Sequence, residues 1–281
     1  MVDGKIIMKF RTFVLFGLAL TDAFMLSGCV VAAEHLSKAK IEVNPAPEMR
    51  GAGEHFTSGY KYRFSGGVNA ALSTTQKVHG IYNELADWCG SRCRELMDEH
   101  NASSKVNLEY EFEYSYVNGS AEVLGSAGPL LWSLGLGFNS GVYGFASLGL
   151  NTKHFEIGVS AGVWNNFRDY EYEGIEYESL LGFLPDVYDV AGTSHSAGTS
   201  LLGLYTSLYF GSISLEVSAS MYDVDLENKR LSREPTIFTM YTTVGYRLDE
   251  HWSVRAGAVN LQGSGVEDMV WSGFAGVSYL L

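Results

Sequence analysis

Apolar and polar residues alternate strictly along much of the chain after about residue 58. The stretch 106–116 is the clearest case. Its apolar face is formed by Val106, Leu108, Tyr110, Phe112, Tyr114 and Tyr116, and its polar face by Asn107, Glu109, Glu111, Glu113 and Ser115. A period of two puts alternate side chains on opposite faces of a strand, whereas a helix would scatter them. The pattern predicts a β-strand with one apolar and one acidic face.

Similar alternation can be followed through ten segments. They cover 60–71, 106–117, 129–139, 142–151, 154–165, 200–210, 213–222, 236–247, 252–260 and 269–281, and most are 9 to 12 residues long. Strands of globular proteins usually have about 5–6 residues, whereas a tilted strand that crosses a bilayer needs about 9–11. The lengths therefore predict strands that span a membrane.

The connections between these segments alternate in length. The longer ones cover 72–105, 166–199, 223–235 and 261–268, while those near 152–154, 211–212 and 249–251 are tight turns. Long and short connections that alternate are typical of an up-and-down outer-membrane barrel with both termini in the periplasm. Two connections depart from the rule, because 118–128 is of medium length and 140–141 is short. We predict an all-β fold, an antiparallel transmembrane β-barrel of about ten strands, with eight or twelve also open.

The last segment carries a terminal pattern. In Gly276-Val-Ser-Tyr279-Leu-Leu281 an aromatic follows the glycine by three residues, and Leu281 stands where phenylalanine is usual. Interfacial aromatics are expected near strand ends, where Trp132, Trp252, Trp271 and Tyr279 stand. Residues 58–281 thus resemble the small outer-membrane barrels of Gram-negative bacteria, of the OmpA, OmpX and OmpW kind. The resemblance implies contact with outer-membrane lipids and recognition of the last strand by the barrel assembly machinery.

The first 28 residues have the features of an export signal. Lys9 and Arg11 precede an apolar run at 13–20, too short for a transmembrane helix, and Leu26-Ser-Gly-Cys29 follows. That last motif resembles the lipobox of bacterial lipoproteins, which implies lipidation at Cys29. Cleavage after Ala33 is the alternative. We expect residues 29–57, which contain Asn44-Pro-Ala-Pro47 and Gly51-Ala-Gly53, to form a periplasmic linker.

Without residues 1–28, 3 of the 19 basic and 2 of the 32 acidic residues are lost, which leaves 16 against 30 and a net charge of −14. This charge argues against nucleic-acid binding. Cys89 and Cys93 predict a small disulfide in an oxidising compartment, with two unpaired cysteines as the alternative. Because Val78, Ile81, Leu85 and Trp88 fall near helical spacing, we expect a short helix or a compact insertion at 75–100.

Strand parity assigns charged residues to the barrel interior. The predicted inward set is Lys61, Arg63, Glu109, Glu111, Glu113, Glu156, Glu216 and Arg255. The interior of such a small barrel is narrow enough to be filled by side chains, and unpaired buried charges are costly. We therefore predict a salt-bridged lumen. Carboxylates outnumber bases in this set, so a narrow cation-preferring pore remains the alternative.

Candidates for chemistry are weak. Ser194-His195-Ser196-Ala-Gly198 lacks the strand–turn–helix context of a nucleophile elbow. A lipid hydrolase that uses His195 remains open, although no third orienting carboxylate is evident. The connection 166–199 is acidic and rich in tyrosine, which suits an extracellular partner. The acidic residues of this connection lack the spacing of a calcium-binding EF-hand. We predict no metal, cofactor or enzymatic activity for the chain. The predicted role is structural or in surface interaction; a soluble lipocalin-like periplasmic lipoprotein is a further alternative.

Overall fold

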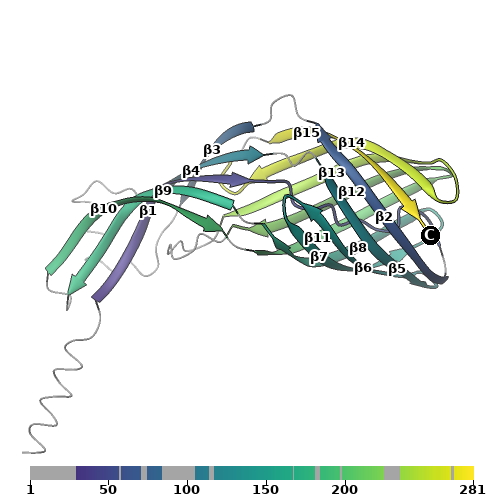
Figure 1. Ribbon diagram of the computed structural model, residues 1–281, viewed down its shortest axis with the longest axis horizontal. Coiled ribbons are helices and arrows are strands. Elements are labelled where there is room, and N and C mark those ends of the chain that lie inside the picture. Colours follow the sequence, from purple (N-terminus) through teal and green to yellow (C-terminus); the bar gives the residue numbers. More distant parts are fainter. Residues whose placement is uncertain are drawn as a thin grey trace, which may run out of the picture. The chain divides into compact units, whose positions relative to one another are not determined.

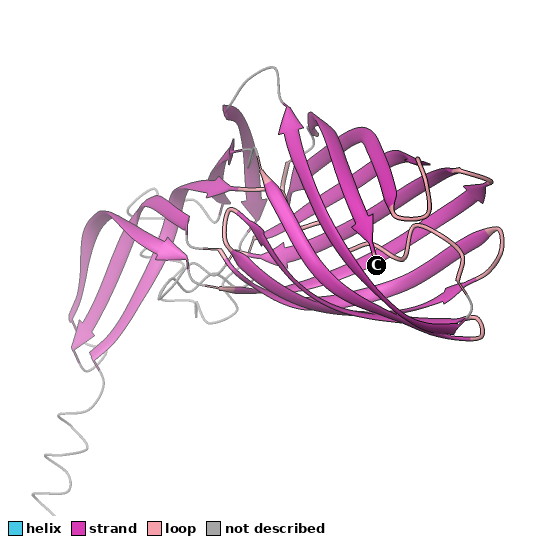
Figure 2. Ribbon diagram, turned by 45° about the vertical axis from the view of Figure 1, so that its right-hand side comes forward, coloured by secondary structure: helices cyan, strands magenta, loops and turns pink. Residues whose placement is uncertain are grey.

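The computed structural model describes residues 30–56, 58–70, 75–83, 105–113, 117–166, 168–180, 184–196, 198–224, 235–266 and 269–281. Their regular structure consists entirely of strands (Figure 2). No helix in these ranges is long and apolar enough to cross a membrane. The strands are β1 (Val30–Val43), β2 (Ser58–Ala70), β3 (Thr75–Asn83), β4 (Lys105–Glu113), β5 (Asn118–Ala127), β6 (Leu130–Asn139), β7 (Val142–Asn151), β8 (Phe155–Asn165), β9 (Arg168–Leu180), β10 (Leu184–Ser196), β11 (Thr199–Phe210), β12 (Ile213–Asp223), β13 (Thr236–Arg247), β14 (Trp252–Gly263) and β15 (Val270–Leu280).

Ten of the strands form a closed barrel in the order β2-β5-β6-β7-β8-β11-β12-β13-β14-β15, with β15 pairing back to β2. Every neighbouring pair is antiparallel. The predicted fold class and the strand number of ten are confirmed. One assignment is wrong: the second barrel strand is β5, whereas the segment 106–117 contributes β4 to a different sheet. Both segments are long enough to span, and only their pairing distinguishes them.

The two ends of the barrel differ in their connections. Residues 128–129, 152–154, 211–212 and 248–251 join strands at one end, where the chain also ends (right-hand end in Figure 1). We call this the short-turn end and the opposite one the long-loop end. In the 248–251 turn, the backbone N–H groups of Trp252 and His251 donate to the Asp249 carboxylate and hold the pKa of Asp249 below its ordinary value. Short turns mark the periplasmic end of outer-membrane barrels.

The outer surface of the barrel is apolar. Its exposed side chains include Leu134, Leu136, Leu148, Ile157, Val159, Leu202, Leu204 and Val244. Aromatic side chains gather near the short-turn end, namely Tyr60, Tyr62, Phe155, Phe210, Tyr246 and Trp252, each between 43% and 71% exposed. Such a surface, with aromatic residues at its edge, is suited to hydrocarbon in the middle and to lipid headgroups at the boundary.

Five strands form a second sheet in the order β10-β9-β1-β4-β3, in which β1 pairs with β4 in parallel and β3 with β4 antiparallel. Where the structure describes the predicted helical insertion, at 75–83, it has the strand β3, so that prediction is wrong there. Contacts divide the chain into two units, residues 36–173 with 191–281, and residues 1–35 with 174–190. In the smaller unit the described residues continue β1, β9 and β10.

Within the larger unit, the apolar face of β1 and β4 closes the long-loop end of the barrel. Ala39, Ile41, Val43, Val106, Leu108, Tyr110 and Phe112 are at most 1% exposed and share a core with barrel residues that include Trp164, Tyr222, Ile237, Leu261, Val266 and Val270. The Tyr110 hydroxyl donates to the Ser264 carbonyl oxygen over 3.0 Å. We call this set of β1 and β4 residues the cap. Burial of this apolar area stabilises the cap on the barrel.

Candidate functional site

The segment from Asn44 to Phe56 lies inside the barrel. Its residues are largely buried, and its polar atoms contact inward-facing residues on opposite sides of the wall. We call this stretch the lumen segment. The expectation of a periplasmic linker over 29–57 is therefore wrong. Residues 30–43 form β1, and residues 44–56 fill the lumen.

At the long-loop end, the wall binds the backbone of the lumen segment. Tyr222 Oη donates to the Asn44 carbonyl oxygen over 2.9 Å, and Asn139 Nδ2 donates to the Pro45 carbonyl oxygen over 2.9 Å. Ala46 N–H donates to Thr239 Oγ1 over 2.9 Å, and its carbonyl oxygen accepts from Tyr241 Oη over 3.0 Å. Buried backbone groups need such partners. The wall thus satisfies a stretch that has no neighbouring strand.

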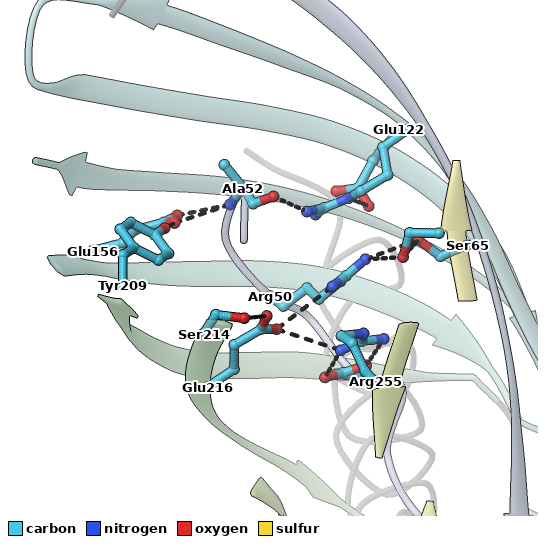
Figure 3. A network of polar contacts seen from close by, with 12 residues as sticks. Arg50, Ala52, Ser65, Glu122, Glu156, Tyr209, Ser214, Glu216 and Arg255 are labelled. Atoms are coloured by element: carbon cyan, nitrogen blue, oxygen red, sulfur yellow. Dashed lines mark hydrogen bonds and ion pairs between the residues drawn. The ribbon is translucent and has the colours of Figure 1, made fainter. Parts of the chain in front are cut away.

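Charged side chains hold the middle of the lumen segment. Arg255 on β14 donates to both carboxylate oxygens of Glu48, over 2.6 and 2.8 Å. Arg50 lies 3.5 Å from a carboxylate oxygen of Glu216 and donates to the hydroxyls of Ser65 and Ser278 (Figure 3). A bidentate pair fixes orientation as well as distance. Two residues of the segment are thereby locked to the wall.

Nearer the short-turn end, Ala52 bridges two buried charges. Its N–H donates to the Glu156 carboxylate over 2.8 Å, and its carbonyl oxygen accepts from Arg63 over 2.6 Å (Figure 3). Arg63 also donates to Glu122 over 2.6 Å, and the Tyr209 hydroxyl donates to Glu156. A buried carboxylate with several donors remains satisfied without water.

The lumen segment reaches the short-turn end at Glu54 and Phe56. The carboxylate of Glu54 pairs with Lys61 and with Arg247, and its carbonyl oxygen accepts from Asn151 over 2.8 Å. Ser126 donates to the Phe56 carbonyl oxygen over 3.0 Å. The contacts therefore extend along the whole lumen.

Small residues on the wall make room for this filling. A Cβ placed on Gly149 or Gly158 would meet the Tyr205 hydroxyl, which points inward. On the segment itself, a Cβ on Gly51 would overlap the Glu156 carboxylate. The absence of a side chain at Gly51 allows the backbone to approach the wall closely.

The structure brings together only part of the predicted lumen set. Arg63, Glu156, Glu216 and Arg255 are buried in the wall, and Lys61 lies at the short-turn end. Sequence analysis missed their partners Glu48, Arg50, Glu54 and Glu122. The first three stand in a stretch without periodicity, and β5 was not recognised as a wall strand.

Glu109, Glu111 and Glu113 are not in the wall. All three lie on β4, so their assignment to the lumen is wrong. Glu109 and Glu111 belong to a ladder of opposite charges across the sheet: Lys77 lies 3.2 Å from Glu109, and Lys40 lies 3.3 Å from Glu111. The hydrogen bond to Glu109, with the charge of Glu111, raises the pKa of Lys77. These acidic residues stabilise the outer face of the sheet.

Other predicted sites cannot be placed. Cys29, Cys89 and Cys93 lie outside the described residues, and so does the side chain of His195. Within the described ranges, no three histidine, cysteine, aspartate or glutamate residues are grouped as metal ligands.

A cavity of about 320 Å³ lies at the short-turn end. Its lining includes Arg50, His55, Glu216, Arg247 and Arg255. Toward the long-loop end the interior is occupied by the lumen segment and the apolar core of the cap. Arg50 and Arg255 hold that segment, so the cavity ends on charged residues that are already paired.

No family model and no curated protein matches the chain. Among solved structures it is similar to the translocator domain of autotransporter NalP from Neisseria meningitidis, at 9% identity over 80% of this chain and 89% of that one, with a TM-score of 0.30. It is also similar to the NanC porin, at 10% identity over 78% of this chain and 98% of that one, with a TM-score of 0.32. A third similar structure is the outer membrane protease OmpT from Escherichia coli, at 12% identity over 82% of this chain and 97% of that one, with a TM-score of 0.31. Similarities at this level carry no argument about function.

The barrel itself indicates where the protein resides. Only helices and closed barrels satisfy every backbone polar group within a bilayer, and this chain has the closed barrel with an apolar exterior. Antiparallel strands with short turns at one end are the architecture of bacterial outer-membrane proteins. The protein belongs in the outer membrane of a Gram-negative bacterium, as predicted.

Proposed function

We propose that the protein is a closed membrane anchor that holds its second sheet and long loops at the cell surface for interaction with other molecules. The observation that carries this proposal is the lumen segment, which occupies the interior from Asn44 to Phe56. A chain held by hydrogen bonds to opposite walls blocks the path that ions would take. Two of the carboxylates that suggested a cation pore lie in the wall and have partners: Glu216 pairs with Arg50, and Glu156 accepts from the Ala52 N–H and the Tyr209 hydroxyl. The others lie on β4, outside the barrel wall.

The surface beyond the long-loop end supports the interaction role. The outer face of the second sheet presents the alternating charges of Lys38, Lys40, Lys77, Glu109 and Glu111. The connection 166–199 is acidic and rich in tyrosine, a composition that suits a recognition surface. We also propose that this connection binds an extracellular partner and that the barrel assembly machinery recognises the C-terminal strand.

Conductance across planar lipid bilayers tests the closed lumen. We expect the wild-type protein to give no steady channel currents, because the lumen segment and the cap fill its interior. A variant that lacks residues 30–56 is expected to conduct ions, provided that it still migrates faster unboiled than boiled on gels.

The wild-type recording decides the matter even where the deletion variant does not fold. A steady cation-selective current through the wild type, reduced by Glu216→Gln, would establish the pore and overturn the closed anchor. Gly66→Ala is the control for the effect of Glu216→Gln on the current. Its added Cβ makes only an ordinary contact with the Asn118 carbonyl oxygen.

A further inference from the structure

The lumen segment has a direction along the barrel. Glu54 and Phe56 contact Lys61, Arg247 and Ser126, which are residues of the short-turn end. Asn44 and Pro45 contact Tyr222 and Asn139, which are residues of the long-loop end. Followed backward from β2, the chain therefore enters the barrel at the short-turn end and leaves it at the long-loop end.

A second observation also places β1 at the long-loop end of the barrel. From Lys38 to Val43, β1 pairs in parallel with β4, from Asn107 to Phe112. β4 lies in the connection between β2 and β5, which joins these strands at the long-loop end. The apolar face of β1 is buried in the cap core. Both the lumen path and the sheet pairing put this part of β1 beyond the long-loop end.

We infer that the chain is threaded through its own barrel, so that residues 36–43, which precede the lumen segment, lie on the outer surface of the cell. The short-turn end is the periplasmic one, because outer-membrane barrels carry short turns in the periplasm and long loops outside. Lys38 and Lys40 are then surface residues.

Threading also explains why the lumen segment is bonded to the wall so extensively. The segment connects β1 in the surface sheet to β2 in the barrel, so any displacement along the lumen would pull β1 away from β4. The pairs Glu48–Arg255 and Arg50–Glu216 resist that displacement. The lumen segment thus serves as a tether between the membrane anchor and the sheet that it presents.

Native lysines allow a direct test on the unmodified protein. Intact cells are treated with a membrane-impermeant amine-reactive ester, at a dose that leaves a periplasmic marker protein unlabelled, and labelled peptides are mapped by mass spectrometry. Lys38, with a side chain 48% exposed, is expected to be labelled, as is Lys77 at 52%. Lys153, exposed in the turn 152–154 at the short-turn end, is expected to remain unlabelled until the outer membrane is permeabilised.

Labelling of Lys38 that appears only after permeabilisation, together with Lys153, would overturn the threading. Labelling of Lys153 but not of Lys38 in intact cells would overturn the orientation of the barrel and the inference with it. Neither result depends on whether the lumen conducts ions, so failure of this inference is distinguishable from failure of the closed anchor.

Discussion

Replacing Arg63 by alanine is expected to lower the free energy of unfolding by about 3–5 kcal/mol, because it leaves a buried carboxylate without its partner. Arg63 and Glu122 side chains are each 2% exposed, and the ion pair joins them over 2.6 Å. Arg63 also donates to the Ala52 carbonyl oxygen. The substitution therefore orphans a charge on β5 and a backbone acceptor on the lumen segment at the same time.

Urea unfolding in lipid vesicles, followed by tryptophan fluorescence, measures this loss. The control is Arg247→Ala, which removes an ion pair with Glu54 from a side chain that is 46% exposed. Exposed pairs contribute about 0–1 kcal/mol. The double variant Arg63→Met/Glu122→Gln is expected to recover part of the loss, since no charge remains buried alone. Similar losses for Arg63→Ala and Arg247→Ala would contradict the buried network.

Tyr110→Ala is expected to destabilise the cap by about 3–5 kcal/mol, the usual cost of truncating a large buried aromatic side chain. Tyr110 is fully buried, its ring stacks on Phe112 at 6.1 Å, and its hydroxyl donates to Ser264. The readout is urea unfolding monitored by proteolytic cleavage within 75–113.

The matched control lies on the opposite face of the same strand. Glu109→Gln with Glu111→Gln removes surface ion pairs to Lys77 and Lys40 and is expected to cost no more than about 1 kcal/mol per pair. If the glutamates faced the lumen, Tyr110 would face lipid. Tyr110→Ala would then lower the free energy of unfolding less than the double glutamate variant does. That reverse order would contradict the cap.

The barrel was largely predictable because a bilayer imposes strict demands on its strands. Each strand must be long enough to span and must alternate between lipid and interior. Nine of the ten predicted segments overlap barrel strands, from β2 to β15. The tenth, at 106–117, alternates more clearly than any other, yet it forms β4. Alternation shows that the two faces differ. It does not tell whether the apolar face meets lipid or a protein core.

The lumen segment could not be predicted because it has no period. Pro45, Pro47, Gly51 and Gly53 interrupt the pattern as they would in a linker. The segment is buried through hydrogen bonds of its backbone and through a few charged side chains, which wall residues far away in sequence satisfy. A hint was present in Glu48, Arg50 and Glu54, which supply charges complementary to the inward residues of the wall.

A double-mutant cycle between Glu48 and Arg255 tests most directly that the chain fills its own lumen. These residues are 207 positions apart, and only a lumen path brings the two side chains within 2.6 Å. Glu48→Gln, Arg255→Gln and the double variant are compared by urea unfolding in vesicles. We predict a coupling energy of at least about 1 kcal/mol, as found for residues in direct contact. If the losses in unfolding free energy of the two single variants add up to that of the double variant within about 0.3–0.5 kcal/mol, as they do for distant sites, the side chains are not in contact. That result would contradict a chain that fills its own lumen.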